Sequence, residues 1–148
     1  MESSTSARVL VVAHKTAANR ALLDAVHARA EQGPASFTLL VPNTQTGLHR
    51  LVDPEDQTVE GAQAVVDSAV PMLQEAAGSC PVDAMIGVSE PLAAIQDAIN
   101  IHGYDEIIIS TLPARVSKWL RLDLPSKAAG LGLPVTTVTA TERVESPA

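Results

Sequence analysis

Five short runs of aliphatic and β-branched residues recur along this chain of 148 residues, and they limit its fold more than any other feature. The runs span residues 8–13, 37–41, 82–88, 106–110 and 135–139. Such runs are typical of parallel strands that are buried on both faces of a sheet. Aromatic residues make up only 2% of the chain, so the core around these strands must be aliphatic.

Amphipathic segments separate the five runs. Apolar residues at helical spacing predict helices over residues 17–32, over residues 58–77, between Ser89 and Gly103, and over residues 125–131. Thr16 is the expected N-cap of the first helix, and Pro71 predicts a kink or a break in the second. The regular alternation of strands and helices predicts an α/β protein, with a five-stranded parallel sheet and helices on both faces.

The chain length fits one domain with its own core. We predict a single domain over residues 7–141, preceded by a disordered leader over residues 1–6 and followed by a polar tail over residues 142–148. Residues 42–57 form the longest segment without a regular pattern. A loop of that length in a compact domain is usually functional or mobile.

Composition argues against several classes of protein. The net charge of −7 disfavours a nucleic-acid-binding protein, which needs a wide basic surface. The longest apolar runs are too short to cross a bilayer, and the first residues lack the pattern of a secretory signal. The single cysteine, Cys80, excludes a disulfide within the chain and a cysteine-based zinc site, and the histidines lack metal-ligand spacing. We therefore expect a cytoplasmic protein that has no metal and does not bind membranes.

Charge is segregated along the chain. Between Leu51 and Ala114 there are eleven Asp and Glu residues and no Lys or Arg. Four cations then follow at Arg115, Lys118, Arg121 and Lys127. They come after the strand predicted at residues 106–110, and α/β proteins bind ligands beyond the carboxyl ends of their parallel strands. Ammonium and guanidinium groups bind phosphate well, so this segment predicts a site for a small anionic ligand.

The predicted site joins the loops that follow the first, second and fourth strands. Its candidate ligand contacts are His14, Lys15, Thr16, Pro42, Ser110, Thr111, Arg115, Ser117, Lys118 and Ser126. An alternative stays open, in which the cations form a solvated loop or pair with the acidic face of a second subunit. The chain has no nucleophile elbow, phosphate loop or dinucleotide fingerprint, and we assign no catalytic residue.

Four segments carry a resemblance to a known family: RVLVVA, GVSEPLAAIQDAI, YDEIIIS and LGLPVTTV. From Arg8 to Thr139 the chain resembles a universal stress protein domain. The resemblance implies a Rossmann-like sheet of the adenine nucleotide α-hydrolase type, in the order 3-2-1-4-5, and a homodimer that pairs the fifth strands edge to edge. The candidate dimer contacts are Trp119, Val135, Thr137 and Thr139.

Nucleotide-binding members of this family carry the motif G-x2-G-x9-G-[ST] after the fourth strand. Counted from the fourth strand, Ser110, Pro113 and Asp123 stand at the three glycine positions, whereas counting back from Pro134 gives a register that differs by two residues. Leu124 stands at the Ser/Thr position. The chain thus resembles a divergent member that lacks the glycine-rich motif. The resemblance implies ATP or another adenine nucleotide as the candidate ligand, and without the glycines side chains would have to hold it.

The leading hypothesis is a non-enzymatic domain of this type that binds a nucleotide or another small anion where the first and fourth strands meet. Two alternatives stay open. One is a ligand-free module for dimerisation or partner binding. The other is a slow nucleotide phosphohydrolase that uses the same pocket.

Overall fold

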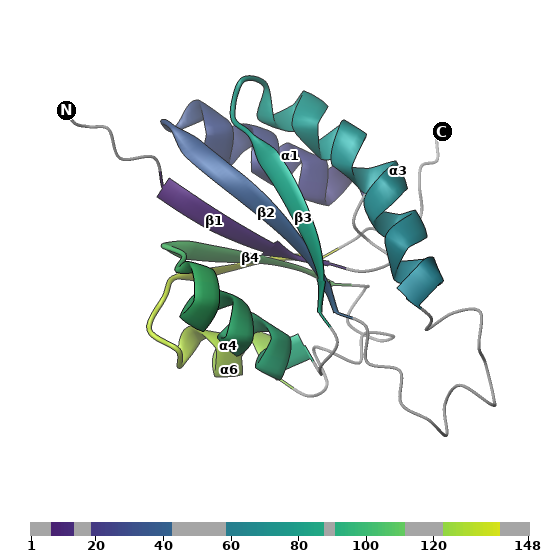
Figure 1. Ribbon diagram of the computed structural model, residues 1–148. Coiled ribbons are helices and arrows are strands. Elements are labelled where there is room, and N and C mark those ends of the chain that lie inside the picture. The colour runs from purple at the N-terminus through teal and green to yellow at the C-terminus, as the bar shows by residue number, and fades with distance from the viewer. Residues whose placement is uncertain (1–6, 14–18, 43–58, 88–90, 112–122, 140–148) are drawn as a thin grey trace.

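The computed structural model describes residues 7–13, 19–42, 59–87, 91–111 and 123–139. Strands and helices alternate within these ranges, as predicted (Figure 1). In chain order they are β1 (Ala7–Val12), α1 (Arg20–Glu31), β2 (Ala35–Pro42), α3 (Val59–Ala77), β3 (Val82–Gly87), α4 (Pro91–His102), β4 (Glu106–Thr111), α6 (Leu124–Ala129) and β5 (Val135–Thr139).

The five strands form one parallel sheet in the order β3-β2-β1-β4-β5. This order confirms the prediction. β1 pairs with β2 on one side and with β4 on the other. From β1 the chain winds outward through β2 and β3, and it then returns to the other side of β1 for β4 and β5. The strand order therefore reverses between β1 and β4, which is where ligands of such folds bind.

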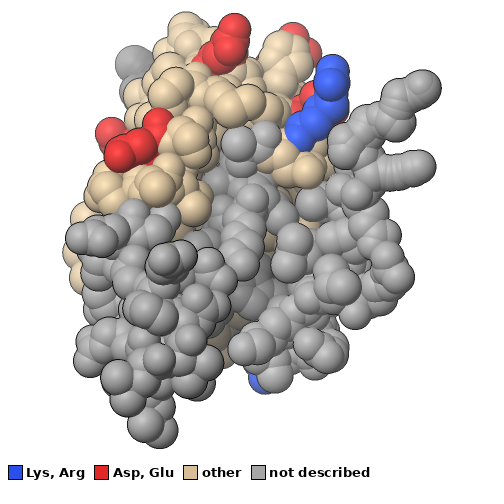
Figure 2. All heavy atoms as spheres, turned by 90° about the vertical axis from the view of Figure 1, so that its right-hand side faces the viewer, with Lys and Arg blue, Asp and Glu red and all other residues tan. Residues whose placement is uncertain are grey.

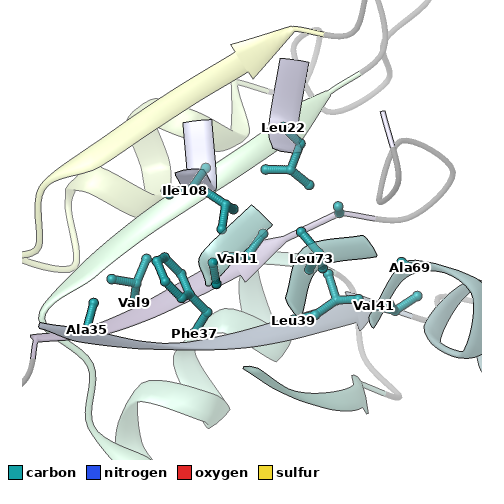
Figure 3. Packing of buried hydrophobic residues seen from close by; sticks show 13 residues of the cluster. Val9, Val11, Leu22, Ala35, Phe37, Leu39, Val41, Ala69, Leu73 and Ile108 are labelled. Atoms are coloured by element: carbon teal, nitrogen blue, oxygen red, sulfur yellow. The ribbon is translucent and has the colours of Figure 1, made fainter. Parts of the chain in front are cut away.

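Helices cover both faces of the sheet, with α1 and α3 on one face and α4 and α6 on the other (Figure 1). Alternate residues of a strand point to opposite faces, so the core forms two clusters. On the first face, Phe37 and Leu39 of β2 pack with Leu73 of α3 (Figure 3). On the second face, Ile109 of β4 packs with Ile95 of α4. Each fully buried side chain of this kind contributes about 1.5–3 kcal/mol of hydrophobic stabilisation.

The start of α1 differs from the prediction. Its N-cap is Asn19, whose side-chain oxygen accepts a hydrogen bond from the backbone N–H of Ala21 over 2.8 Å. The prediction of Thr16 as the N-cap is therefore wrong. The physical reason is that the amide oxygen of Asn19 satisfies one of the N–H groups that the first helical turn leaves free.

The helix α3 runs without interruption from Val59 to Ala77 although it contains Pro71. The chain therefore does not break at this proline, contrary to one of the two outcomes predicted for it. Pro71 lies on the exposed side of the helix. Water can reach the carbonyl of Asp67 there, which loses its backbone donor to the proline.

Polar side chains are paired at the amino ends of β1 and β4. The guanidinium of Arg29 in α1 donates to both carboxylate oxygens of Glu106, with an Nε–Oε1 distance of 2.9 Å and an Nη2–Oε2 distance of 2.7 Å. These hydrogen bonds raise the pKa of Arg29. The backbone N–H of Arg8 donates to the Asp105 carboxylate over 2.8 Å, and its guanidinium donates to the carbonyl of His102 over 2.6 Å. These contacts tie helix ends and loops to the edge of the sheet opposite the switch point.

Candidate functional site

The central strands end side by side at the carboxyl edge of the sheet. Val12 of β1 lies level with Leu40 of β2 and Ile109 of β4. β2 continues beyond this row to Pro42, and β4 continues to Thr111. The two strands that flank β1 therefore extend past it at the switch point. This edge faces the reader in Figure 2, where acidic side chains are scattered over the described surface towards α1 and α3.

Thr111 is the most informative residue at this edge. Its side chain is 1% exposed. Among the side chains that the structure describes, its Oγ1 is the one buried polar atom without a hydrogen-bond partner. Alternation along β4 places Thr111 on the same face as Ile107 and Ile109, towards α4 and α6. A buried hydroxyl group without a partner costs about 1–3 kcal/mol, so Thr111 offers a polar group that a ligand could satisfy.

Asp123 lies at the same edge, at the amino end of α6. The chain leaves β4 at the carboxyl edge and enters β5 at the amino edge, so the helix between them begins towards the carboxyl side of the sheet (Figure 1). The backbone of Asp123 is left-handed, with φ 61° and ψ 38°. Its neighbour Leu124 is buried in the same cluster as Ile109. The Asp123 side chain is exposed and does not cap the helix.

Two further residues at the carboxyl edge were not predicted as site residues. α1 follows β1, so Asn19 and Arg20 at its amino end lie beyond the end of β1. Arg20 is exposed and makes no ion pair with a residue that the structure describes. The sequence contains a signal for this helix start, because Asn19 is at least as good an N-cap residue as the predicted Thr16. With Asn19 as the N-cap, Arg20 would have been predicted at the amino end of the helix.

The structure locates part of the predicted ligand contacts. Pro42 ends β2 and Thr111 ends β4, so both lie at the carboxyl edge. Ser110 is buried on the opposite face of β4 from Thr111. Ser126 is exposed on α6. The other predicted contacts lie outside the described residues, and their roles stay predictions: His14, Lys15, Thr16, Arg115, Ser117 and Lys118.

The predicted dimer contacts on β5 lie at an edge of the sheet. β5 pairs with β4 on one side, and no described strand pairs with its other side. Thr137 and Thr139 are exposed, whereas Val135 is half-buried and packs against the core cluster on the sheet face that α4 and α6 cover. Trp119 lies outside the described residues. The homodimer that pairs the fifth strands therefore stays a prediction.

Within the described ranges, no group of three His, Cys, Asp or Glu side chains is arranged to hold a metal ion. No helix of the described part of the chain is long and apolar enough to cross a membrane.

Comparison with known proteins gives structural matches only. No protein-family model and no curated protein matches the chain. A universal stress protein from Lactobacillus plantarum matches with 19% identity and a TM-score of 0.64, over 92% of this chain and 99% of that protein. A universal stress protein in complex with cAMP matches with 16% identity and a TM-score of 0.64, over 93% and 100% of the two chains. The Archaeoglobus fulgidus universal stress protein in complex with dAMP matches with 13% identity and a TM-score of 0.57, over 90% and 98%.

These matches extend over nearly the full length of both proteins in each pair. They agree with the strand order β3-β2-β1-β4-β5 and with helices on both faces of the sheet. The chain therefore has the fold of the universal stress proteins.

Proposed function

We propose that this chain is a divergent, non-enzymatic universal stress protein domain that binds an adenine nucleotide or another small anion at the switch point between β1 and β4. The observation that carries the proposal is the buried hydroxyl of Thr111, which has no hydrogen-bond partner at the carboxyl end of β4. Buried polar groups in native proteins are almost always paired. One that remains unpaired at the expected ligand edge suggests that its partner arrives with a ligand.

The chemistry of a threonine hydroxyl suits this role. The group donates one hydrogen bond and accepts others. It can donate to a phosphate oxygen or exchange hydrogen bonds with a ribose hydroxyl. A hydrogen bond to a charged oxygen is stronger than one between neutral groups, and burial of Thr111 strengthens it further because the local dielectric constant is low.

Two proteins of the same fold support an adenine nucleotide as the ligand class. One structure is a complex with cAMP and another is a complex with dAMP. Both ligands combine an adenine base with a single phosphate group. In this chain the predicted basic contacts of the segment after β4, Arg115 and Lys118, would hold the phosphate, and Arg20 would add a cation from α1.

The direct test is isothermal titration of the purified protein with cAMP, AMP and ATP, after any co-purified nucleotide has been removed. Thr111→Val removes the hydroxyl and keeps the side-chain size. We expect this change to weaken nucleotide binding about tenfold, as the loss of one hydrogen bond predicts. Thr111→Ser keeps the hydroxyl and should bind within about threefold of the unmodified protein.

The matched control is Thr136→Val, which removes an exposed hydroxyl from β5. It should leave the dissociation constant unchanged. The absence of binding for cAMP, AMP and ATP, together with no nucleotide in the protein as purified, would remove nucleotide binding from the proposal.

A second candidate function is a dimerisation module, and the edge of β5 favours it. The strand has the sequence VTTVT, without a charged residue or a proline. Edge strands that stay unpaired usually carry such residues to prevent pairing with another chain. We expect Thr137→Lys to shift a homodimer towards monomer in light scattering after gel filtration. Under the same conditions, a monomeric unmodified protein would exclude this candidate.

A further inference from the structure

We infer that Thr139 of β5 is a second contact for the ligand, which lies on the face of the sheet that α4 and α6 cover. The inference rests on the proposed nucleotide site at Thr111. It gives a ligand-binding role to Thr139, which the sequence suggested only as a dimer contact, and it states on which side of β4 the ligand lies.

The strand register places Thr139 beside Thr111. Thr139 is the residue of β5 that is level with Thr111 of β4. β1, the other neighbour of β4, ends at Val12, which is level with Ile109. Among the described strands, only β5 therefore has a residue level with Thr111. Adjacent strands lie about 4.8 Å apart, so the two threonine side chains are within reach of a single ligand group.

Both threonine side chains lie on the same face of the sheet. Ile107 and Val135 are partners in the register, and both pack in the core cluster on the face that α4 and α6 cover. Thr111 and Thr139 come four residues later in their strands, and alternate residues of a strand share a face. They therefore lie on the same face as that cluster. Val138 packs in the cluster on the opposite face, as the alternation requires.

Exposure to solvent differs between the two threonines. Thr111 is 1% exposed, whereas Thr139 is exposed. The preceding row shows the same difference, because Ile109 is fully buried and its partner Thr137 is exposed. Solvent therefore reaches this face of the sheet at β5, next to the buried hydroxyl. A ligand that enters from this side contacts the hydroxyl of Thr139 and supplies the partner that the Oγ1 of Thr111 lacks.

The two hydroxyl groups complement the cations of the proposed site. Arg115, Lys118 and Arg20 are assigned to the phosphate group under the proposed function. The hydroxyl groups carry no charge, and each donates one hydrogen bond and accepts others. Thr139 therefore adds a contact that does not depend on the charge of the ligand.

A ligand contact at Thr139 is compatible with a dimer that pairs the edge of β5. Strand pairing uses the backbone N–H and C=O groups, which lie in the plane of the sheet. The side chains project from the two faces of the sheet. The hydroxyl of Thr139 can therefore serve the ligand whether or not the edge is paired.

The first test measures whether a nucleotide covers Thr139. Thr139→Cys is made together with Cys80→Ala, so that the chain carries one thiol. The rate of its reaction with a neutral maleimide is measured with and without cAMP. At a cAMP concentration about ten times the dissociation constant, roughly nine-tenths of the sites are filled, so the reaction should slow about tenfold. The matched control is Thr136→Cys with Cys80→Ala. Thr136 is exposed on the opposite face of the same strand, and its variant should react at one rate with and without cAMP.

The second test measures affinity by isothermal titration with cAMP. Thr139→Val removes the hydroxyl and should weaken binding about fivefold, as the loss of one hydrogen bond predicts. Thr139→Ser keeps the hydroxyl and should bind within about twofold of the unmodified protein. Because Thr139 is exposed, Thr139→Val should leave the urea midpoint of the ligand-free protein unchanged. This result separates a lost ligand contact from a lost structural contact.

The outcomes distinguish the two proposals. The inference requires both protection of Thr139→Cys and weaker binding by Thr139→Val, and either result without the other overturns the contact. Equal slowing of Thr139→Cys and Thr136→Cys also overturns it, because the whole strand is then covered. If Thr111→Val weakens binding while both tests fail at Thr139, the second contact is wrong and the nucleotide site stands. If cAMP, AMP and ATP do not bind to the unmodified protein, both proposals are overturned.

Discussion

Replacement of Thr111 by valine should stabilise the ligand-free protein and weaken its response to ligand. Valine has nearly the same shape as threonine and lacks the hydroxyl, whose Oγ1 is buried without a partner. Removing a buried unpaired hydroxyl recovers part of its desolvation cost of about 1–3 kcal/mol. We therefore expect the free energy of unfolding to rise by about 1–2 kcal/mol. In a domain of this size, that corresponds to an increase in Tm of about 2–8 °C.

Urea unfolding followed by circular dichroism measures the change, with nucleotide removed beforehand. The slope of the unfolding free energy against urea should not change, because valine alters neither the fold nor the area exposed on unfolding. Thr136→Val, on the exposed surface of β5, should stay within about 0.5 kcal/mol of the unmodified protein. With saturating nucleotide, the gain in stability should be smaller for Thr111→Val than for the unmodified protein, because stabilisation by a ligand follows its affinity.

A loss of stability in Thr111→Val would refute the reasoning. It would mean that the hydroxyl has a partner in the folded, ligand-free protein, so that valine leaves that partner unsatisfied. Thr111→Ser gives an independent check. It keeps the hydroxyl and removes one buried methyl group, so it should destabilise the protein by about 1 kcal/mol.

Three further predictions concern the parts of the fold that position the site. Glu106→Gln breaks the partly buried ion pair with Arg29 and should lower the free energy of unfolding by about 1–3 kcal/mol. The double change Arg29→Met with Glu106→Leu should lower the free energy of unfolding less, because it leaves no charge unpaired. Asn19→Ala removes the N-cap of α1 and should cost about 1 kcal/mol in urea unfolding, while Asn100→Ala on the exposed side of α4 should not. Gly103→Ala should cost about 1 kcal/mol or more, because φ is 78° there and no atom within 3.4 Å opposes the added carbon, so the loss reports backbone strain alone.

The sequence predicted the sheet well because its signals are local. A buried parallel strand needs a short apolar run, and each of the five runs became a strand with nearly the expected bounds. Helix ends were harder to predict, because several residues near a helix start can cap it. Asn19 rather than Thr16 caps α1. Which of these residues becomes the N-cap depends on how many residues the chain needs to pass from the end of β1 to the start of the helix.

Interactions between distant parts of the chain could not be predicted. The Arg29–Glu106 pair joins residues 77 positions apart, and the bond from Arg8 to Asp105 spans 97 positions. No periodic pattern marks such pairs, because the sheet order decides which residues meet. Thr111 was predicted as a ligand contact from its position after β4. That its hydroxyl is both buried and unpaired depends on the packing around it, which the sequence does not show.

The two ends of β4 differ in a way that bears on function. At its amino end, Glu106 accepts hydrogen bonds from Arg29 of a neighbouring helix. At its carboxyl end, Thr111 is buried as deeply as the core but its hydroxyl has no partner. One polar side chain of β4, Glu106, thus has its hydrogen-bond partners within the described part of the protein, whereas another, Thr111, has none. Unsatisfied polar groups in native proteins concentrate where a function compensates for their cost, and this is why we propose that a ligand binds at the carboxyl end of β4.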